Sequence, residues 1–146
     1  MRCQVKCVFG LLLVLVVPAS AQQASRPYSE GSVINVQYIR LKPGQFDAYM
    51  AYLAGPYKQL MEGEKKAGVI TSWAVYSSDS RDEKDWDLAL TTTYKNLAAM
   101  DNLRDRSDPV VNQVFGSNEK SNEASIKRGE MRDAVGSRLL RELIIK

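Results

Sequence analysis

Two amides at alternate positions of one predicted strand are the side chains best suited to bind or polarise a small molecule. Asn35 and Gln37 lie in the run from Val33 to Leu41, in which every second residue faces the same side of a strand. Amides among apolar neighbours are either hydrogen-bonded or exposed to a cavity. In a cavity they could stabilise an enolate-like anion. Pairing within the sheet is the simpler interpretation, and we favour it.

Aromatic side chains and one arginine could complete such a cavity. Tyrosine and tryptophan combine a large apolar surface with a polar group, and an arginine could balance an anion near the mouth. The candidate cavity-lining residues are Asn35, Gln37, Tyr38, Trp73, Tyr76, Trp86, Tyr94 and Arg106. Core packing or a solvated charge also explains these residues, so the sequence assigns no catalytic residue.

The residue types that are missing exclude several chemistries. The sequence has no histidine, and its two cysteines, Cys3 and Cys7, lie near the N-terminus. A mature chain without both residue types lacks the usual zinc ligands, the histidine ligand of haem, and the nucleophile or base of many hydrolases. The acidic residues between Asp79 and Asp87 lack the spacing of a calcium-binding loop. We therefore expect no metal site and no cofactor.

The N-terminal residues 1–21 are typical of a cleavable export signal. Arg2 and Lys6 precede the apolar run from Val8 to Val17, and Ala19-Ser20-Ala21 supplies small residues before the predicted cleavage point. A membrane-spanning helix needs roughly 20 apolar residues, and this run is about half that length. We expect a protein that is exported to the periplasm or the medium and keeps no stable membrane anchor after cleavage.

The remaining chain suits one domain. Removing 21 of the 146 residues leaves 125, and it lowers Lys plus Arg from 20 to 18 against 17 Asp plus Glu, so the net charge falls to about +1. Such a small charge gives no reason to expect binding to nucleic acid. Polar residues 22–31 are expected to form a loose leader, and residues 32–146 the domain.

The first half of the domain predicts a strand followed by a helix. A strand over 33–41 ends at Lys42-Pro43-Gly44, because proline cannot donate to a sheet and glycine permits a tight turn. Apolar residues at three- and four-residue steps then predict a helix that begins near Gln45 and ends near Ala67. Pro56 removes a hydrogen bond inside that helix, so Gly55-Pro56 predicts a kink.

The second half predicts three more strands and a divided helical region. The predicted elements are strands over 70–76, 86–94 and 137–145, and helices from about 97, over 109–115 and over 119–135. Alternation in the strand over 86–94 places Trp86 on the same side as Leu88 and Tyr94. Asn96 suits a helix cap, and Asp108-Pro109 predicts a new helix start. The helix over 119–135 is weak because charged residues interrupt its apolar stripe.

This order of elements specifies an α+β fold. Strand, helix, strand, strand, helix, strand is a ferredoxin-like βαββαβ sandwich, here with an extra helical insertion before the last strand. Both helices would cover one face of the sheet. Apolar residues on both sides of several strands indicate that the second face is covered too. We expect a homodimer in which two sheets pack face to face into an α/β barrel.

Four segments carry characteristic turn and strand residues: Lys42 to Phe46, Gly68 to Trp73, Asp85 to Leu88, and Val135 to Leu143. In them the chain resembles the dimeric α/β-barrel superfamily, particularly its small exported members of unassigned function. That superfamily includes haem-degrading and cofactor-free monooxygenases, chlorite dismutases and lactone isomerases. The resemblance implies a dimeric barrel, and the lack of histidine does not support the branches that hold haem through histidine.

Two functional hypotheses follow. The first is an exported dimeric protein that binds a small hydrophobic or aromatic molecule or a protein partner. The alternative is a cofactor-free, metal-free enzyme, like a monooxygenase or an isomerase, acting on an aromatic or enolisable small molecule. An open cavity beside Asn35 or Gln37 would keep the enzyme hypothesis, whereas satisfied amides in a filled core would remove its candidates.

Overall fold

The computed structural model describes residues 26–79, 82 and 85–146 of the chain. The predicted export signal over 1–21 and the first residues of the predicted leader lie outside this part. Among the described residues, none of the helices has both the length and the apolar character that a membrane crossing requires.

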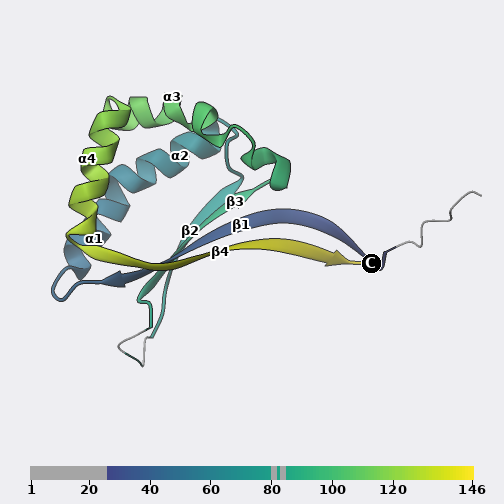
Figure 1. Cartoon of the computed structure of the whole chain (residues 1–146), viewed down its shortest axis with the longest axis horizontal. Helices are drawn as coiled ribbons and strands as arrows, with labels where there is room; N and C mark the ends of the chain where they lie inside the picture. The colour runs from purple at the N-terminus through teal and green to yellow at the C-terminus, as the bar shows by residue number, and fades with distance from the viewer. Residues whose placement is uncertain (1–25, 80–81, 83–84) are drawn as a thin grey trace, which may run out of the picture.

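Four antiparallel strands form one sheet (Figure 1). They are β1 (Tyr28–Leu41), β2 (Ser72–Ser77), β3 (Leu88–Tyr94) and β4 (Arg132–Ile145). The sheet has the order β2-β3-β1-β4, so the first strand lies between the third and the fourth. The ferredoxin-like βαββαβ topology predicted from the sequence is confirmed.

The helices cover one face of this sheet and leave the other face bare (Figure 1). The first crossover consists of α1 (Phe46–Tyr52), a π-helical turn η1 (Leu53–Tyr57) and α2 (Lys58–Lys66). The second consists of a 3-10 turn η2 (Leu97–Met100), α3 (Leu103–Phe115) and α4 (Asn118–Gly129). Helix α4 descends from α3 to the start of β4, next to α1. The extra helical insertion is thus present as α4.

The predicted kink at Gly55-Pro56 is confirmed. Gly55 has φ −99° and ψ −106°, which is not helical, and Pro56 follows it inside the π-helical turn. Proline lacks the N–H that an α-helix needs at this position, and one extra residue in the turn accommodates the loss. The kink keeps the apolar stripe on both sides of it directed at the sheet.

The core lies between this kinked segment and the two central strands. Tyr49, Leu53 and Met61 pack against a sheet face that includes Val33 and Ile39, all of them buried. Helix α3 lies close above α2, where a Cβ atom added to Gly63 would approach a methyl group of Val110 to 2.6 Å. The absence of a side chain at Gly63 therefore permits this close contact between the helices.

Several predicted boundaries need correction. β1 begins at Tyr28 rather than Val33, so residues 28–30 of the expected loose leader pair instead with the end of β4. Asp108-Pro109 does not start a new helix, because α3 runs continuously through Pro109. The contact of Val110 with Gly63 explains how packing outweighs the single hydrogen bond that proline removes. The last helix ends at Gly129, and residues 132–136, which were expected before the final strand, belong to β4.

β1 and β4 continue together beyond the helices as a two-stranded ribbon that carries both ends of the described chain (Figure 1). The backbone N–H of Lys146 donates to the carbonyl of Pro27 at 3.0 Å. An ion pair joins Arg141 to Glu30 at 2.7 Å, and the Ser32 hydroxyl donates to Glu142 at 2.8 Å. Hydrogen bonds and an ion pair therefore hold the two strands of the ribbon together. Large apolar side chains of β4 are nevertheless exposed on it.

Candidate functional site

A cavity of about 230 Å³ lies between the sheet and the helices. Its wall combines apolar side chains with amide, hydroxyl, carboxyl and guanidinium groups. The lining residues are Asn35, Gln37, Leu90, Thr92, Tyr94, Tyr57, Met61, Glu64 and Arg128. They come from β1, β3, the helical segment η1–α2, and α4, so both crossovers contribute to one site.

The two predicted amides meet in this cavity. Asn35 and Gln37 lie on the helix-facing side of β1, next to Thr92 and Leu90 of β3. Asn35 is half-buried, whereas Gln37 is exposed and lies at the mouth. Within the described part of the chain, neither side chain makes a hydrogen bond, so both amides are available to a ligand. A ligand-binding role for these amides therefore stays a prediction.

Glu64 supplies a carboxyl group inside the cavity. It lies one turn beyond Met61 on the buried stripe of α2, and only 9% of it is exposed. Burial raises the pKa of Glu64, because a carboxylate is poorly solvated there, and an interaction with the Ser107 side chain partly opposes this rise. Functional sites often contain a buried carboxyl group whose pKa is raised.

Tyr57 lies under the kink and is held by Trp73 from β2. The two rings meet edge to face with centroids 5.8 Å apart, and the indole N–H of Trp73 donates to Glu62 at 3.0 Å. Burial raises the pKa of Tyr57 to about 12, with smaller contributions from the neighbouring Tyr49 and Tyr52. Trp73 thus supports a wall residue of the cavity. Burial also raises the pKa of Tyr94, and Glu64 adds to this rise.

Two arginines and two tyrosines form an Arg–Tyr cluster at one end of the cavity: Tyr49, Tyr52, Arg128 and Arg132. The tyrosine rings stack with centroids 5.9 Å apart. Arg128 lies 5.5 Å from the centroid of the Tyr52 ring, and Arg132 lies 5.8 Å from that of Tyr49. Arg128 also donates to the Tyr52 hydroxyl at 2.8 Å. The cluster joins α1, α4 and the start of β4.

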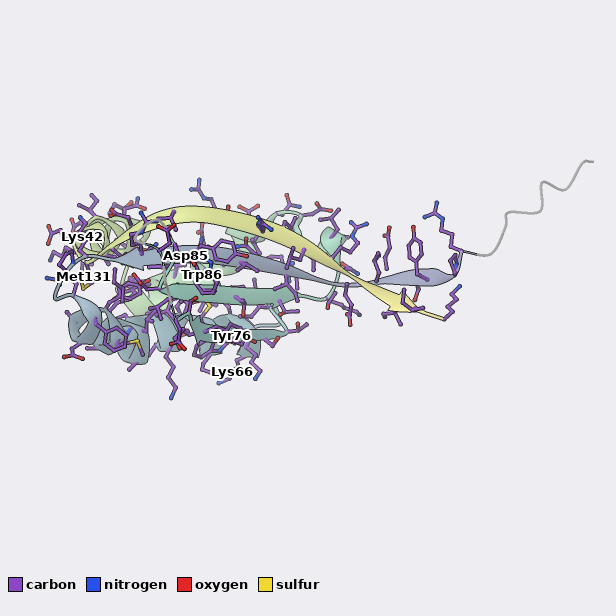
Figure 2. The ribbon with its side chains drawn as sticks, turned by 90° about the horizontal axis from the view of Figure 1, so that it is seen from below. Lys42, Lys66, Tyr76, Asp85, Trp86 and Met131 are labelled. Carbon is purple, nitrogen blue, oxygen red and sulfur yellow. The ribbon has the colours of Figure 1, made fainter. Side chains whose placement is uncertain are left out.

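Three other predicted residues lie on the bare face of the sheet. Tyr38 and Trp86 contact each other with ring centroids 5.2 Å apart, and Tyr76 is exposed on β2 (Figure 2). The expectation that Trp86 shares a face with Leu88 and Tyr94 was wrong. β3 begins only at Leu88, and the segment before it crosses the end of β1, where the Arg40 side chain donates to the Asp85 carbonyl at 3.0 Å.

The bare face carries a second hollow, distinct from the cavity. It measures about 440 Å³ and is lined by Tyr38, Trp86 and the stretch from Val135 to Arg138. Arg106 belongs to neither hollow. Its guanidinium donates to the carbonyls of Ala99 at 2.7 Å and Gly68 at 3.0 Å, and so fastens α3 to the loop that follows α2. Of the eight candidates, Asn35, Gln37 and Tyr94 line the cavity, and the other five lie elsewhere.

The sequence did not single out Glu64, Tyr57, Arg128 or Arg132. Glu64 and Tyr57 follow the helical spacing of the apolar stripe, and a carboxyl group at such a position indicates a buried polar site. Arg128 is one of the charged residues that interrupt the apolar stripe over 119–135, and a charge on the inner face of a helix gives the same signal. Arg132 had no comparable signal. Among the described residues, no three Asp or Glu side chains are placed to hold a metal ion.

Comparison with solved structures supports the fold described above. The structure is similar to that of HapK from Hahella chejuensis, with a TM-score of 0.52 and 11% identity over 75% of this chain and 91% of that chain. The chain has the ferredoxin-like fold. At this identity the likeness shows the fold alone. No protein-family model matches the sequence, and no curated protein matches it either.

Two further solved structures have lower TM-scores. One is a dimeric ferredoxin-like protein from an uncultured marine organism, with a TM-score of 0.49 and 9% identity over 81% of this chain and 98% of that chain. The other is a dimeric protein of unknown function with a ferredoxin-like fold from Bacteroides fragilis, with a TM-score of 0.43 and 14% identity over 76% of this chain and 94% of that chain.

The raised pKa of Tyr57 predicts a loss of stability in alkali. The unfolded chain ionises this tyrosine near pH 10, whereas the folded protein keeps its proton until about pH 12. The unfolded state therefore binds fewer protons in this range, and the free energy of unfolding should fall as pH rises from 10 to 12. Two pKa units correspond to about 2 to 3 kcal/mol. Urea unfolding at several pH values measures the fall.

Tyr57→Phe removes the ionisable group and should make the fall smaller. Tyr28→Phe, at a partly exposed tyrosine at the start of β1, is the matched control and should keep the wild-type fall. If the free energy of unfolding falls equally with pH in the Tyr57→Phe variant and the wild type, this interpretation is contradicted.

Proposed function

We propose that the protein binds a small organic molecule in the cavity between the sheet and the helices, and that it does so as a homodimer. The observation that carries the proposal is the convergence of two unpaired amides, a buried carboxyl group and a guanidinium on one cavity. A cavity that served only packing would be expected to carry apolar walls, because unpaired polar groups in a core are costly.

The dimensions of the cavity favour a small ligand. Drug-sized ligands occupy pockets of about 300 to 1,000 Å³, and this cavity measures about 230 Å³. Tyr57 and Tyr94 offer aromatic surface, while Leu90 and Met61 provide apolar contact. Polar groups around most of the wall, together with two aromatic rings, favour a small aromatic molecule with one or two oxygen atoms.

The bare face of the sheet supports the homodimer. Strand register places Ile34 next to Leu140 of β4 and Thr93 of β3, and Ala89 next to Tyr76. Leu140 is 46% exposed and Tyr76 is 55% exposed. An exposed face rich in aliphatic, aromatic and threonine residues indicates an interface, and an identical sheet is the simplest partner for it.

Enzymatic activity is a second candidate, and Glu64 is the observation that favours it. An ionised Glu64 could remove a proton from a carbon next to a carbonyl group of the ligand. The electron pair of the broken C–H bond would move onto the carbonyl oxygen, and Arg128 or an amide would stabilise the enolate. Proton return at another carbon would give an isomerisation that needs no other reactant.

Ligand binding can be tested by amide NMR with a panel of small phenols, aryl carboxylates and enolisable ketones. Binding compounds should shift the amide signals of Asn35, Gln37, Glu64 and Arg128. Gln37→Trp places a large side chain at the mouth and should weaken binding at least about tenfold. Gln113→Trp, at an exposed position of α3, should leave binding unchanged. If no compound binds, or if the shifts lie only around Tyr38 and Trp86, the proposed site is wrong.

Dimerisation can be tested by light scattering at micromolar concentration on the chain without residues 1–21. The wild type should have the mass of two chains. Leu140→Glu puts a charge on the bare face and should give the mass of one chain, because burying an unpaired carboxylate is costly. The matched control is Ile126→Glu, at an exposed apolar residue of α4, which should stay dimeric. A monomeric wild type contradicts the proposed interface.

The enzyme candidate predicts exchange of carbon-bound hydrogen for deuterium in enolisable ketones. Glu64→Gln removes the base and should slow the exchange by about 10² to 10⁴-fold. The wild-type exchange rate should increase with pH until Glu64 is ionised. Because burial raises the pKa of Glu64, this increase should occur at a higher pH than for an ordinary carboxyl group. Glu123→Gln, at an exposed residue of α4, is the control. Exchange that is as fast in the Glu64→Gln variant as in the wild type would remove Glu64 from this role.

A further inference from the structure

The Arg–Tyr cluster has hydrogen-bond donors without acceptors. The Tyr49 hydroxyl, the Nε atom of Arg128 and the Nε atom of Arg132 are all closed to solvent and have no partner among the described residues. Tyr49 as a whole residue is fully buried. Nearly all buried polar groups of folded proteins are paired, so three unpaired donors in one cluster indicate a missing acceptor.

The charges of the cluster are also unbalanced. Neither Arg128 nor Arg132 makes an ion pair in the described part of the chain. Burial lowers the pKa of Arg132, and the positive charge of Arg128 lowers it further, while Tyr49 acts in the opposite direction. Two half-buried arginines that repel each other are costly to hold together unless an anion lies between or beside them.

The cluster is continuous with the proposed ligand cavity, because Arg128 belongs to both. Arg128 is the cationic side chain of the cavity wall, and Glu64 is the carboxyl group of the same wall. Glu64 lies two helical turns beyond Tyr57, or about 10 Å along the axis, and makes no ion pair with Arg128. Because burial favours the neutral form of Glu64 and the described residues show no ion pair between the two side chains, Glu64 does not balance the charge of Arg128.

We infer that the ligand of this cavity is a small organic anion, whose carboxylate or enolate oxygen lies against Arg128 and is attracted by Arg132 behind it. The inference rests on the proposed function and gives the chemical class of its ligand. A buried water molecule could accept hydrogen bonds from the unpaired donors, but it would not balance two positive charges. An anion does both.

A pair of isosteric probes tests this inference. Benzoate and benzamide have nearly the same shape and differ in charge, so their dissociation constants, measured by calorimetry on the full folded protein, isolate the effect of the anion. Charged hydrogen bonds contribute about 1.5 to 3 kcal/mol, so benzoate should bind about tenfold or more tightly than benzamide. Inorganic phosphate should bind more weakly than benzoate, because it leaves the aromatic wall of the cavity without contact.

Three variants separate charge from packing. Arg128→Gln should remove the preference for benzoate and leave the binding of benzamide nearly unchanged. Arg132→Gln, which changes a charge outside the cavity wall, should reduce the preference by a smaller factor. Arg104→Gln, at an exposed arginine of α3, should change neither. A general loss of structure would weaken both probes equally, which distinguishes it from a loss of charge.

The possible outcomes separate this inference from the proposed function. Equal binding of benzoate and benzamide overturns the inference but leaves a ligand site in the cavity. Phosphate that binds as tightly as benzoate overturns the organic part of the inference and indicates an inorganic anion. If neither aryl probe binds while other members of the panel shift the cavity amides, the anionic class is wrong. If nothing binds, the proposed function fails together with the inference.

Discussion

The packing of one kinked helical segment against the two central strands is the interaction on which the rest of the structure depends. Tyr49, Leu53 and Met61 are buried on its inner side, and they cover Val33 and Ile39 of β1. The same stripe continues through Tyr57 and Glu64, so the core and the cavity are successive parts of one helix face. A site built into such a packed stripe is held rigidly, because its walls also stabilise the fold.

In the proposed function, the covered face of the sheet binds the ligand and the bare face forms the dimer interface. The covered face presents amides, tyrosines and one arginine to a cavity with an open mouth, whereas the bare face presents aliphatic and aromatic residues over a broad surface. Assembly would bury the contact between Tyr38 and Trp86 without filling the cavity, because the sheet separates the two. Ligand binding and association are therefore expected to be separable by mutation.

Local chemistry predicted most of the fold, and long-range packing determined what was missed. Gly68 and Gly116 have positive φ values of 70° and 88° at positions where the sequence predicted that helices end. Pro109 misled the prediction because the close contact between Val110 and Gly63 cannot be read from either segment alone. The amides were correctly placed on one strand face, but nothing local indicated that Glu64 and Arg128, from separate crossovers, would meet them.

The pairing of the first strand with the last has a consequence for how the chain folds. Ser32 and Glu142 are hydrogen-bonded across 110 residues of sequence, and β1 holds its central place in the sheet only when β4 has joined it. Contacts between such distant segments close late and slow the folding reaction, because the entropy of a long loop must be lost before they form. A growing chain would thus remain without its completed sheet until the final strand was available.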